Sequence, residues 1–262
     1  MIAAILFDLD ETLIFDHPVS LHAFKDCAFY AGSWYGLDLE RLVQSAEQNA
    51  VRLWKSSPEY GYTLRIGHSA GEGLWARYEE GDHPAIHNLH AFAPEFRAAV
   101  WREALADQNI HDDALSQALA RRYAERRRVY PRYPEVDALL KALKPRYKLG
   151  IVTNGVPDLQ GDKLEGCGLG MAFDAAVISG VVDIGKPERG IFDHICKELE
   201  VDPADCVMVG DNPERDIAGA IAAGMRSVFV SRGFRAKDPR YPADLECTNL
   251  LEMLPWLERA EG

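Results

Sequence analysis

Two aspartates, Asp8 and Asp10, end the first apolar run of the chain and are the first residues that could do chemistry. The run Ile2–Phe7 is apolar throughout, which predicts a buried strand of a parallel sheet. Residues i and i+2 of an extended strand point to the same side, so both carboxylates are expected together at its carboxyl end. Such a pair repels unless a cation lies between its members, and Mg²⁺ prefers carboxylate and phosphate oxygens. The alternative is an acidic, solvated turn, because this pattern is common by chance.

Two later stretches place phosphate-binding groups in similar positions. Thr153 and Asn154 follow the apolar run Leu149–Val152. A hydroxyl and turn amides at a strand end can hold phosphate oxygens, although an ordinary turn explains the same residues. Lys186 stands between a glycine and a proline that restrict its backbone. A single lysine is usually a solvated surface charge, but this setting favours a functional role.

A third stretch adds two further acids. The apolar run Val207–Gly210 ends in Asp211, and Asp216 follows five residues later, inside the first turns of an expected helix. Asp216 alone could be an ordinary helix N-terminal charge. Ligands of open α/β sheets bind at the carboxyl ends of the strands, so we expect all these polar residues at one edge.

Strands and helices alternate along the rest of the chain that carries these residues. After Pro131, helices are expected over 134–144, 157–166, 188–199 and 213–223, and strands over 147–153, 174–179, 205–210 and 226–231. This order predicts an α/β fold with a doubly wound parallel sheet. Residues 232–235 read as a loop, and Leu250–Arg259 as a final packing helix.

Between the first strand and this region, the pattern is helical only. Apolar residues recur at helical spacing over 19–30, 39–54, 94–107 and 113–128, with Asp38 as the N-cap of the second and Asp112-Asp113 as the cap of the fourth. The sequence therefore predicts a core of residues 1–15 and 131–262 and an inserted helical subdomain of residues 16–130. Glycines and aromatics in Pro58–Gly73 indicate a loop between helices; the alternative is that Tyr62, Arg65 or His68 faces a substrate.

Composition narrows the class of protein. The 262 residues include 47% apolar and 27% charged residues, an ordinary globular composition, with a formal net charge of −12. This charge argues against a nucleic-acid partner, and an anionic substrate would need a local cationic site. No apolar run is long enough for a membrane span, so no membrane partner is expected. Five cysteines without a C-x-x-C pair suit a reducing compartment, and the absence of a basic leader predicts a cytoplasmic enzyme.

Taken together, the polar motifs resemble those of the haloacid dehalogenase-like hydrolase superfamily. The matching residues, in the family's order, are Asp8-Leu9-Asp10-Glu11-Thr12, Thr153, Lys186, and Gly210-Asp211 through Asp216. The resemblance covers residues 1–15 and about 131–235, and it implies that the helical insert is a cap over the active site.

The resemblance also implies a role for each residue. Asp8 would attack phosphorus and form an aspartyl-phosphate, and Asp10 would protonate the leaving alcohol and then activate water. Thr153, Asn154 and Lys186 would bind the phosphoryl oxygens. Mg²⁺ would be held by Asp8, the carbonyl of Asp10 and Asp211. Asp216 would either bind the ion directly or orient one of its ligands.

Asp10 separates the branches of this superfamily. Its dehalogenases lack an acid two residues after the nucleophile, so the resemblance favours a phosphatase acting on a small phosphorylated metabolite, similar to the nucleotidase-like and N-acylneuraminate-phosphatase-like members. A sugar phosphomutase, a dehalogenase and a catalytically silent binding module on the same fold stay open as alternatives. The oligomeric state, monomer or dimer, also stays open.

Overall fold

We describe a computed structural model of the chain over residues 1–261, with the side chain of residue 261 left out. The chain divides into two compact units. The first comprises Met1–Phe15, Tyr130–Gly155 and the chain from Leu164 onward; the second comprises Asp16–Val129 and Val156–Lys163. The helical unit thus includes residues 156–163, which the sequence pattern assigned to the core.

The first unit is built on a six-stranded parallel sheet in the order β3-β2-β1-β4-β5-β6. Its central strand is β1, and the predicted α/β fold with a doubly wound sheet is confirmed. The strands are β1 Ala4–Phe7, β2 Lys148–Thr153, β3 Ala175–Ile178, β4 Cys206–Gly210, β5 Arg226–Val230 and β6 Leu245–Cys247. The last of these, a short edge strand, was not predicted.

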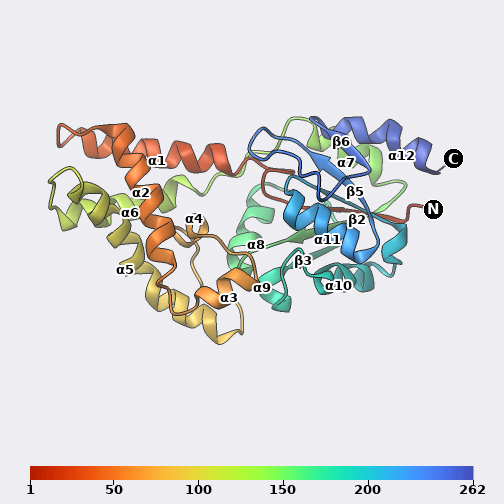
Figure 1. The fold of residues 1–262 in the computed structure, drawn as a ribbon, viewed down its shortest axis with the longest axis horizontal. Coiled ribbons are helices and arrows are strands. Elements are labelled where there is room, and N and C mark those ends of the chain that lie inside the picture. Colours follow the sequence, from red (N-terminus) through yellow and green to blue (C-terminus); the bar gives the residue numbers. More distant parts are fainter. Residues whose placement is uncertain (262) are drawn as a thin grey trace. The chain divides into compact units, whose positions relative to one another are not determined.

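Alternating side chains of the sheet build two separate cores. Ile5 and Phe7 of β1 belong to one core, while Ala4 and Leu6 belong to the other. Helices α7 Val136–Leu143 and α12 Met253–Glu261 cover the first face, and α10 Arg189–Leu199 and α11 Ala218–Ala223 cover the second (Figure 1). Apolar residues on both faces explain why β1 has no polar alternation, as expected of a buried parallel strand.

The second unit is helical over its described residues. It contains α1 His17–Gly32, α2 Leu39–Trp54, α3 Tyr60–Arg65, α4 Ala70–Gly73, α5 Pro84–Ala106, α6 Asp113–Arg126 and most of α8 Pro157–Gly166. Asp38 caps α2 as predicted, and of the predicted pair Asp112-Asp113 it is Asp112 that caps α6. Their carboxylates accept from the backbone N–H groups of Arg41 and Leu115. Aromatic side chains fill its core, with the rings of Phe24 and Tyr123 4.5 Å apart.

Two predictions for this unit were wrong in detail. Pro58–Gly73 is not a loop, because it holds α3 and α4, and the capping box of Ser69 and Glu72 starts α4 despite its glycines. Helix α5 begins at Pro84, ten residues before the predicted start, and Pro94 lies inside it. The extra turns are retained because their apolar side chains continue the buried face: Ala85, Ile86, Leu89 and Ala93. No helix in residues 1–261 is long and apolar enough to cross a membrane.

Candidate active site

The parallel register brings Asp8, Thr153 and Asp211 to one edge of the sheet. Asp8 directly follows β1, Thr153 is the last residue of β2, and Asp211 directly follows β4. The backbone N–H of Asp8 donates to the carbonyl of Val209 at 2.9 Å, which fixes the first residue beyond the strand. All three residues are buried, so a polar group that lacks a partner there costs free energy.

Lys186 bridges two of the acids. Its Nζ lies 2.6 Å from Oδ1 of Asp8 and 2.7 Å from Oδ1 of Asp216. Burial alone would lower the pKa of Lys186, but the charges of Asp216 and Asp8 raise it above its usual value. The lysine is therefore held as a cation. The other carboxylate oxygen of Asp8 accepts from Thr12 Oγ1 at 3.1 Å, so both oxygens of Asp8 have a fixed direction.

Gly210 makes room for Asp216. The carboxylate of Asp216 accepts from the backbone N–H of Asn212 at 3.0 Å, and a Cβ on residue 210 would lie 2.2 Å from the same oxygen. Only glycine fits there. Asn212 also caps the turn Pro213–Ile217 through hydrogen bonds to two of its N–H groups. This packing couples the glycine at position 210 to the observed place of the Asp216 carboxylate.

Three carboxylates converge on one point of the site. One oxygen each of Asp8, Asp211 and Asp216 lies within 4.8 Å of the others. Burial, together with Asp8 and Asp216, raises the pKa of Asp211 to about 8, although the guanidinium of Arg235, in contact with Asp211, pulls it down. When all three carboxylates are ionised, the cluster holds more negative charge than Lys186 and Arg235 balance. Buried carboxylate oxygens in excess of their counter-charges fit a hard divalent cation such as Mg²⁺.

Thr153 and Asn154 have different surroundings. The hydroxyl of Thr153 is buried and lacks a hydrogen-bond partner within residues 1–261, which suits a group that awaits a ligand. Asn154 instead uses its side-chain amide on Lys186: its Nδ2 donates to the carbonyl of Lys186 at 3.0 Å, and its Oδ1 accepts from the N–H of Lys186 at 2.8 Å. The contacts of Asn154 thus position the lysine backbone.

Asp10 lies beyond the strand rather than in it. The sequence argument extended the strand alternation to Asp10, but β1 ends at Phe7, and Asp10 forms an isolated bridge with Ile14. The chain turns at Glu11, whose φ of 58° is in the left-handed region. The carboxylate of Asp10 is outside the three-acid cluster, so a contact of Asp10 with metal would have to come from its carbonyl, as the resemblance implied.

Sequence reasoning missed the residues that support this turn. Tyr133 donates from its hydroxyl to Glu11 at 2.8 Å, and the guanidinium of Arg232 stacks on the ring of Tyr133 at 3.6 Å. Arg232 also donates to the carbonyl of Thr12 at 2.9 Å. Arg235, three residues further on, contacts Asp211. The sequence signal for Arg232 and Arg235 was the stretch 232–235, in which two arginines and a glycine follow a predicted strand. This stretch was interpreted only as a loop.

Three residues of the helical unit were predicted as possible substrate contacts, and they differ in exposure. Tyr62 and His68 are buried within that unit, whereas Arg65 is exposed. His68 shares a hydrogen bond of 2.8 Å with the hydroxyl of Tyr78, and burial lowers its pKa to about 4. A neutral, buried His68 is therefore part of the packing of its own unit.

Comparisons with known proteins identify the family. The sequence profile of the haloacid dehalogenase-like hydrolase family matches residues 2–224. A phosphoserine phosphatase of Thermus thermophilus is 40% identical over 95% of this chain and 96% of its own. Among solved structures, a 2-haloacid dehalogenase of Pseudomonas syringae superposes with a TM-score of 0.60 at 26% identity, covering both chains fully. A HAD-hydrolase of Bacillus subtilis bound to magnesium superposes with a TM-score of 0.67 at 18% identity over 98% of each chain, which speaks for the fold alone.

The chain belongs to the haloacid dehalogenase-like hydrolase family. Within that family it falls in the phosphatase branch, as a phosphoric monoester hydrolase. The resemblance noted from its motifs is therefore confirmed at the level of family and branch.

Proposed function

We propose that this protein is a Mg²⁺-dependent phosphatase that hydrolyses a small phosphorylated metabolite through an aspartyl-phosphate on Asp8. The observation that carries the proposal is the joint placement of a buried, oriented carboxylate (Asp8), a buried cation (Lys186) and an unpartnered hydroxyl (Thr153) at one sheet edge. A carboxylate nucleophile, a counter-charge for phosphoryl oxygens and a neutral donor are what phosphoryl transfer requires.

In the first step, an oxygen of Asp8 forms a bond to phosphorus while the bond from phosphorus to the leaving oxygen breaks. Lys186 and the hydroxyl of Thr153 stabilise the charge on the phosphoryl oxygens, and Asp10 gives its proton to the leaving alcohol. In the second step, Asp10 takes a proton from water, whose oxygen attacks phosphorus. The bond from phosphorus to Asp8 then breaks, which releases inorganic phosphate and restores the carboxylate.

A metal ion would be held by Asp8 and Asp211, with Asp216 as a direct ligand or as a residue that orients one, and with the carbonyl of Asp10. When bound, Mg²⁺ supplies positive charge for the phosphoryl oxygens. The fit rests on the excess of buried carboxylate charge over cationic charge in the cluster. Thr12 and Asn154 serve by position, since they fix Asp8 and Lys186 respectively.

O-phosphoserine is the first substrate to test, because the relative named for it spans nearly the whole chain. The experiment measures phosphate release from O-phosphoserine and a panel of sugar, nucleoside and triose phosphates, with and without Mg²⁺, beside halide release from a 2-haloacid. We expect phosphate release that a chelator abolishes, no halide release, and acid-stable labelling of Asp8 by substrate phosphate. Halide release without phosphate release would refute the proposal. The cytoplasmic location stays a prediction, and the oligomeric state stays open between monomer and dimer.

A further inference from the structure

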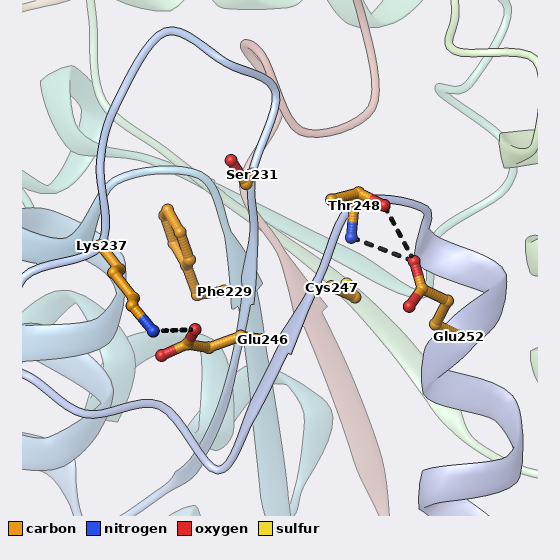
Figure 2. Close-up of a pocket in the computed structure, with 7 residues that line it drawn as sticks. All are labelled: Phe229, Ser231, Lys237, Glu246, Cys247, Thr248 and Glu252. Atoms are coloured by element: carbon orange, nitrogen blue, oxygen red, sulfur yellow. Dashed lines mark hydrogen bonds and ion pairs between the residues drawn. The ribbon is translucent and has the colours of Figure 1, made fainter.

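The loop that follows β5 carries four cationic side chains, and one of them differs from the rest. The four are Arg232, Arg235, Lys237 and Arg240. Three pair with carboxylates outside the catalytic cluster: Arg232 with Glu135 at 2.7 Å, Lys237 with Glu246 at 2.9 Å, and Arg240 with Asp238 at 2.5 Å and Glu214 at 2.8 Å. Figure 2 shows the second of these pairs beside the pocket at β5 and β6. Arg235 instead pairs with Asp211.

The loop is anchored shortly before Arg235 by contacts that do not involve Asp211. Arg232 anchors the start of the loop through Glu135, Tyr133 and the carbonyl of Thr12. Gly233 then turns the chain with a φ of +83°, a conformation that favours glycine. The side chain of Arg235 is 45% exposed, whereas that of Asp211 is 5% exposed. The guanidinium therefore reaches a buried acid from the rim of the site and has solvent on its other side.

A guanidinium in contact with Asp211 conflicts with a divalent cation at the same carboxylate. Both would draw on the charge of one aspartate, and in a buried region of low dielectric the two cations repel each other across it. The cluster needs positive charge both with and without a bound metal ion, because Asp8, Asp211 and Asp216 are buried together. The two cations are thus alternatives for one position, and the anchored loop allows the side chain to leave into solvent.

We propose that Arg235 is the counter-ion of ionised Asp211 in the metal-free protein and that a bound divalent cation displaces it. Arg235 then sets the affinity of the site for metal, because each binding event must break its pair with Asp211. This inference rests on the proposed metal-dependent function. It assigns to Arg235 a role in metal binding and not in the reaction itself, so it is tested by binding rather than by turnover.

The first test is calorimetric titration of chelator-stripped protein with Mg²⁺. The titration is done on the parent and on three variants, Arg235→Gln, Arg235→Lys and Lys237→Gln. The pH is raised until the Mg²⁺ affinity of each protein levels off, so that protons no longer compete with the metal. We expect Arg235→Gln to bind about tenfold more tightly than the parent at this plateau, since one unit of opposing charge is removed. Lys237→Gln removes the same charge two residues away, from a pair that does not involve the cluster, and should stay within about twofold of the parent. Arg235→Lys should stay near the parent, because it keeps the charge.

The second test follows the guanidinium directly in the unmodified chain. Phenylglyoxal labels exposed arginine side chains, and peptide mass spectrometry reports each residue separately. Saturating Mg²⁺ should raise the labelling rate of Arg235 several-fold, while Arg240 of the same loop, whose partners are Asp238 and Glu214, should not change.

The outcomes separate this inference from the proposed function. A parent that binds no divalent cation refutes the metal-dependent function and this inference with it. A parent that binds Mg²⁺ normally, with Arg235→Gln equal to Lys237→Gln or weaker, leaves the function standing and overturns the role of Arg235. Equal labelling of Arg235 with and without metal also overturns it.

Discussion

Protons and Mg²⁺ should compete for the cluster of Asp8, Asp211 and Asp216, and the competition can be predicted from Asp211. In the metal-free fold its pKa is raised to about 8 from the ordinary value of 3.8, by burial first and then by Asp8 and Asp216. Below this pKa the folded protein keeps a proton on Asp211 that a bound cation must expel. We therefore expect apparent Mg²⁺ affinity to rise with pH and to level off above about pH 9.

The magnitude follows from the shifted pKa. One pKa unit corresponds to about 1.4 kcal/mol. At about pH 6, two units below the pKa of Asp211, expelling the proton makes Mg²⁺ binding less favourable by about 2.7 kcal/mol, which is roughly 100-fold in affinity. The pH dependence of folding stability that Asp211 contributes has the opposite sign to that of an ordinary paired aspartate. The folded state binds this proton more tightly than the unfolded state, so metal-free stability falls as the pH rises from about 4 to about 8. The Mg²⁺-induced rise in Tm should therefore grow over this range.

The assay is calorimetric titration of Mg²⁺ at about pH 6, 7, 8 and 9, each in two buffers with different ionisation enthalpies. The difference between buffers gives the number of protons released, which we expect to fall from about one to about zero across the range. Asp193→Asn, which alters an exposed carboxylate paired with Arg189, should reproduce the parent profile. Asp211→Asn should lose both tight binding and proton release. A dissociation constant that varies less than about threefold, with no proton release, would refute the reasoning.

Three further predictions concern the candidate active site. Asp8→Asn keeps the shape of the side chain but not its charge, so kcat should fall by about three orders of magnitude or more while circular dichroism and metal-free Tm show an intact fold. Gly210→Ala places a Cβ against the carboxylate of Asp216 and should lower the free energy of unfolding by about 1–3 kcal/mol, with loss of activity; Gly161→Ala, whose new Cβ meets nothing within 4 Å, should do neither. Asp10→Asn should give a burst of p-nitrophenol and then slow turnover with p-nitrophenyl phosphate, because that leaving group needs almost no proton but water still needs a base.

Each of these predictions has an outcome that contradicts it. Near-parental turnover of Asp8→Asn would mean that water attacks phosphorus directly. Parental stability and activity of Gly210→Ala would show that the carboxylate of Asp216 does not need its observed place. If Asp10→Asn slows the first step equally for p-nitrophenyl phosphate and for an alkyl phosphate, with no burst, Asp10 is not the proton donor.

The sheet and most of the candidate site were predictable because their signals are local. Short apolar runs mark β1, β2 and β4, and parallel strands end at a common edge, so Asp8, Thr153 and Asp211 could be brought together without a structure. Element boundaries were harder. Helix α5 continues through Pro94 because the apolar face N-terminal to the proline is buried, and burial outweighs a residue that by itself marks a helix start.

The supporting contacts were not predictable, because they join residues far apart in the chain. Nothing near Asn154 indicates that its amide binds the backbone of Lys186, 32 residues later. Likewise, the hydrogen bond from Tyr133 to Glu11 spans 122 residues. Such contacts depend on how the loops after separate strands meet, and a single sequence gives the residues at the strand ends but not their pairing.

Arg235 shows why the electrostatics of this site are harder to predict than its residues. A motif identifies the acids, and their spacing predicts a metal site, but the metal affinity of such a site depends on the balance between all charges that share the low-dielectric region. That balance includes a cation 24 residues beyond Asp211, on a loop whose start is fixed by Arg232 and Gly233. A change in this loop would leave every motif residue intact and still alter how tightly the site binds metal. Two proteins with identical catalytic motifs can therefore differ in their metal requirement through residues that no motif contains.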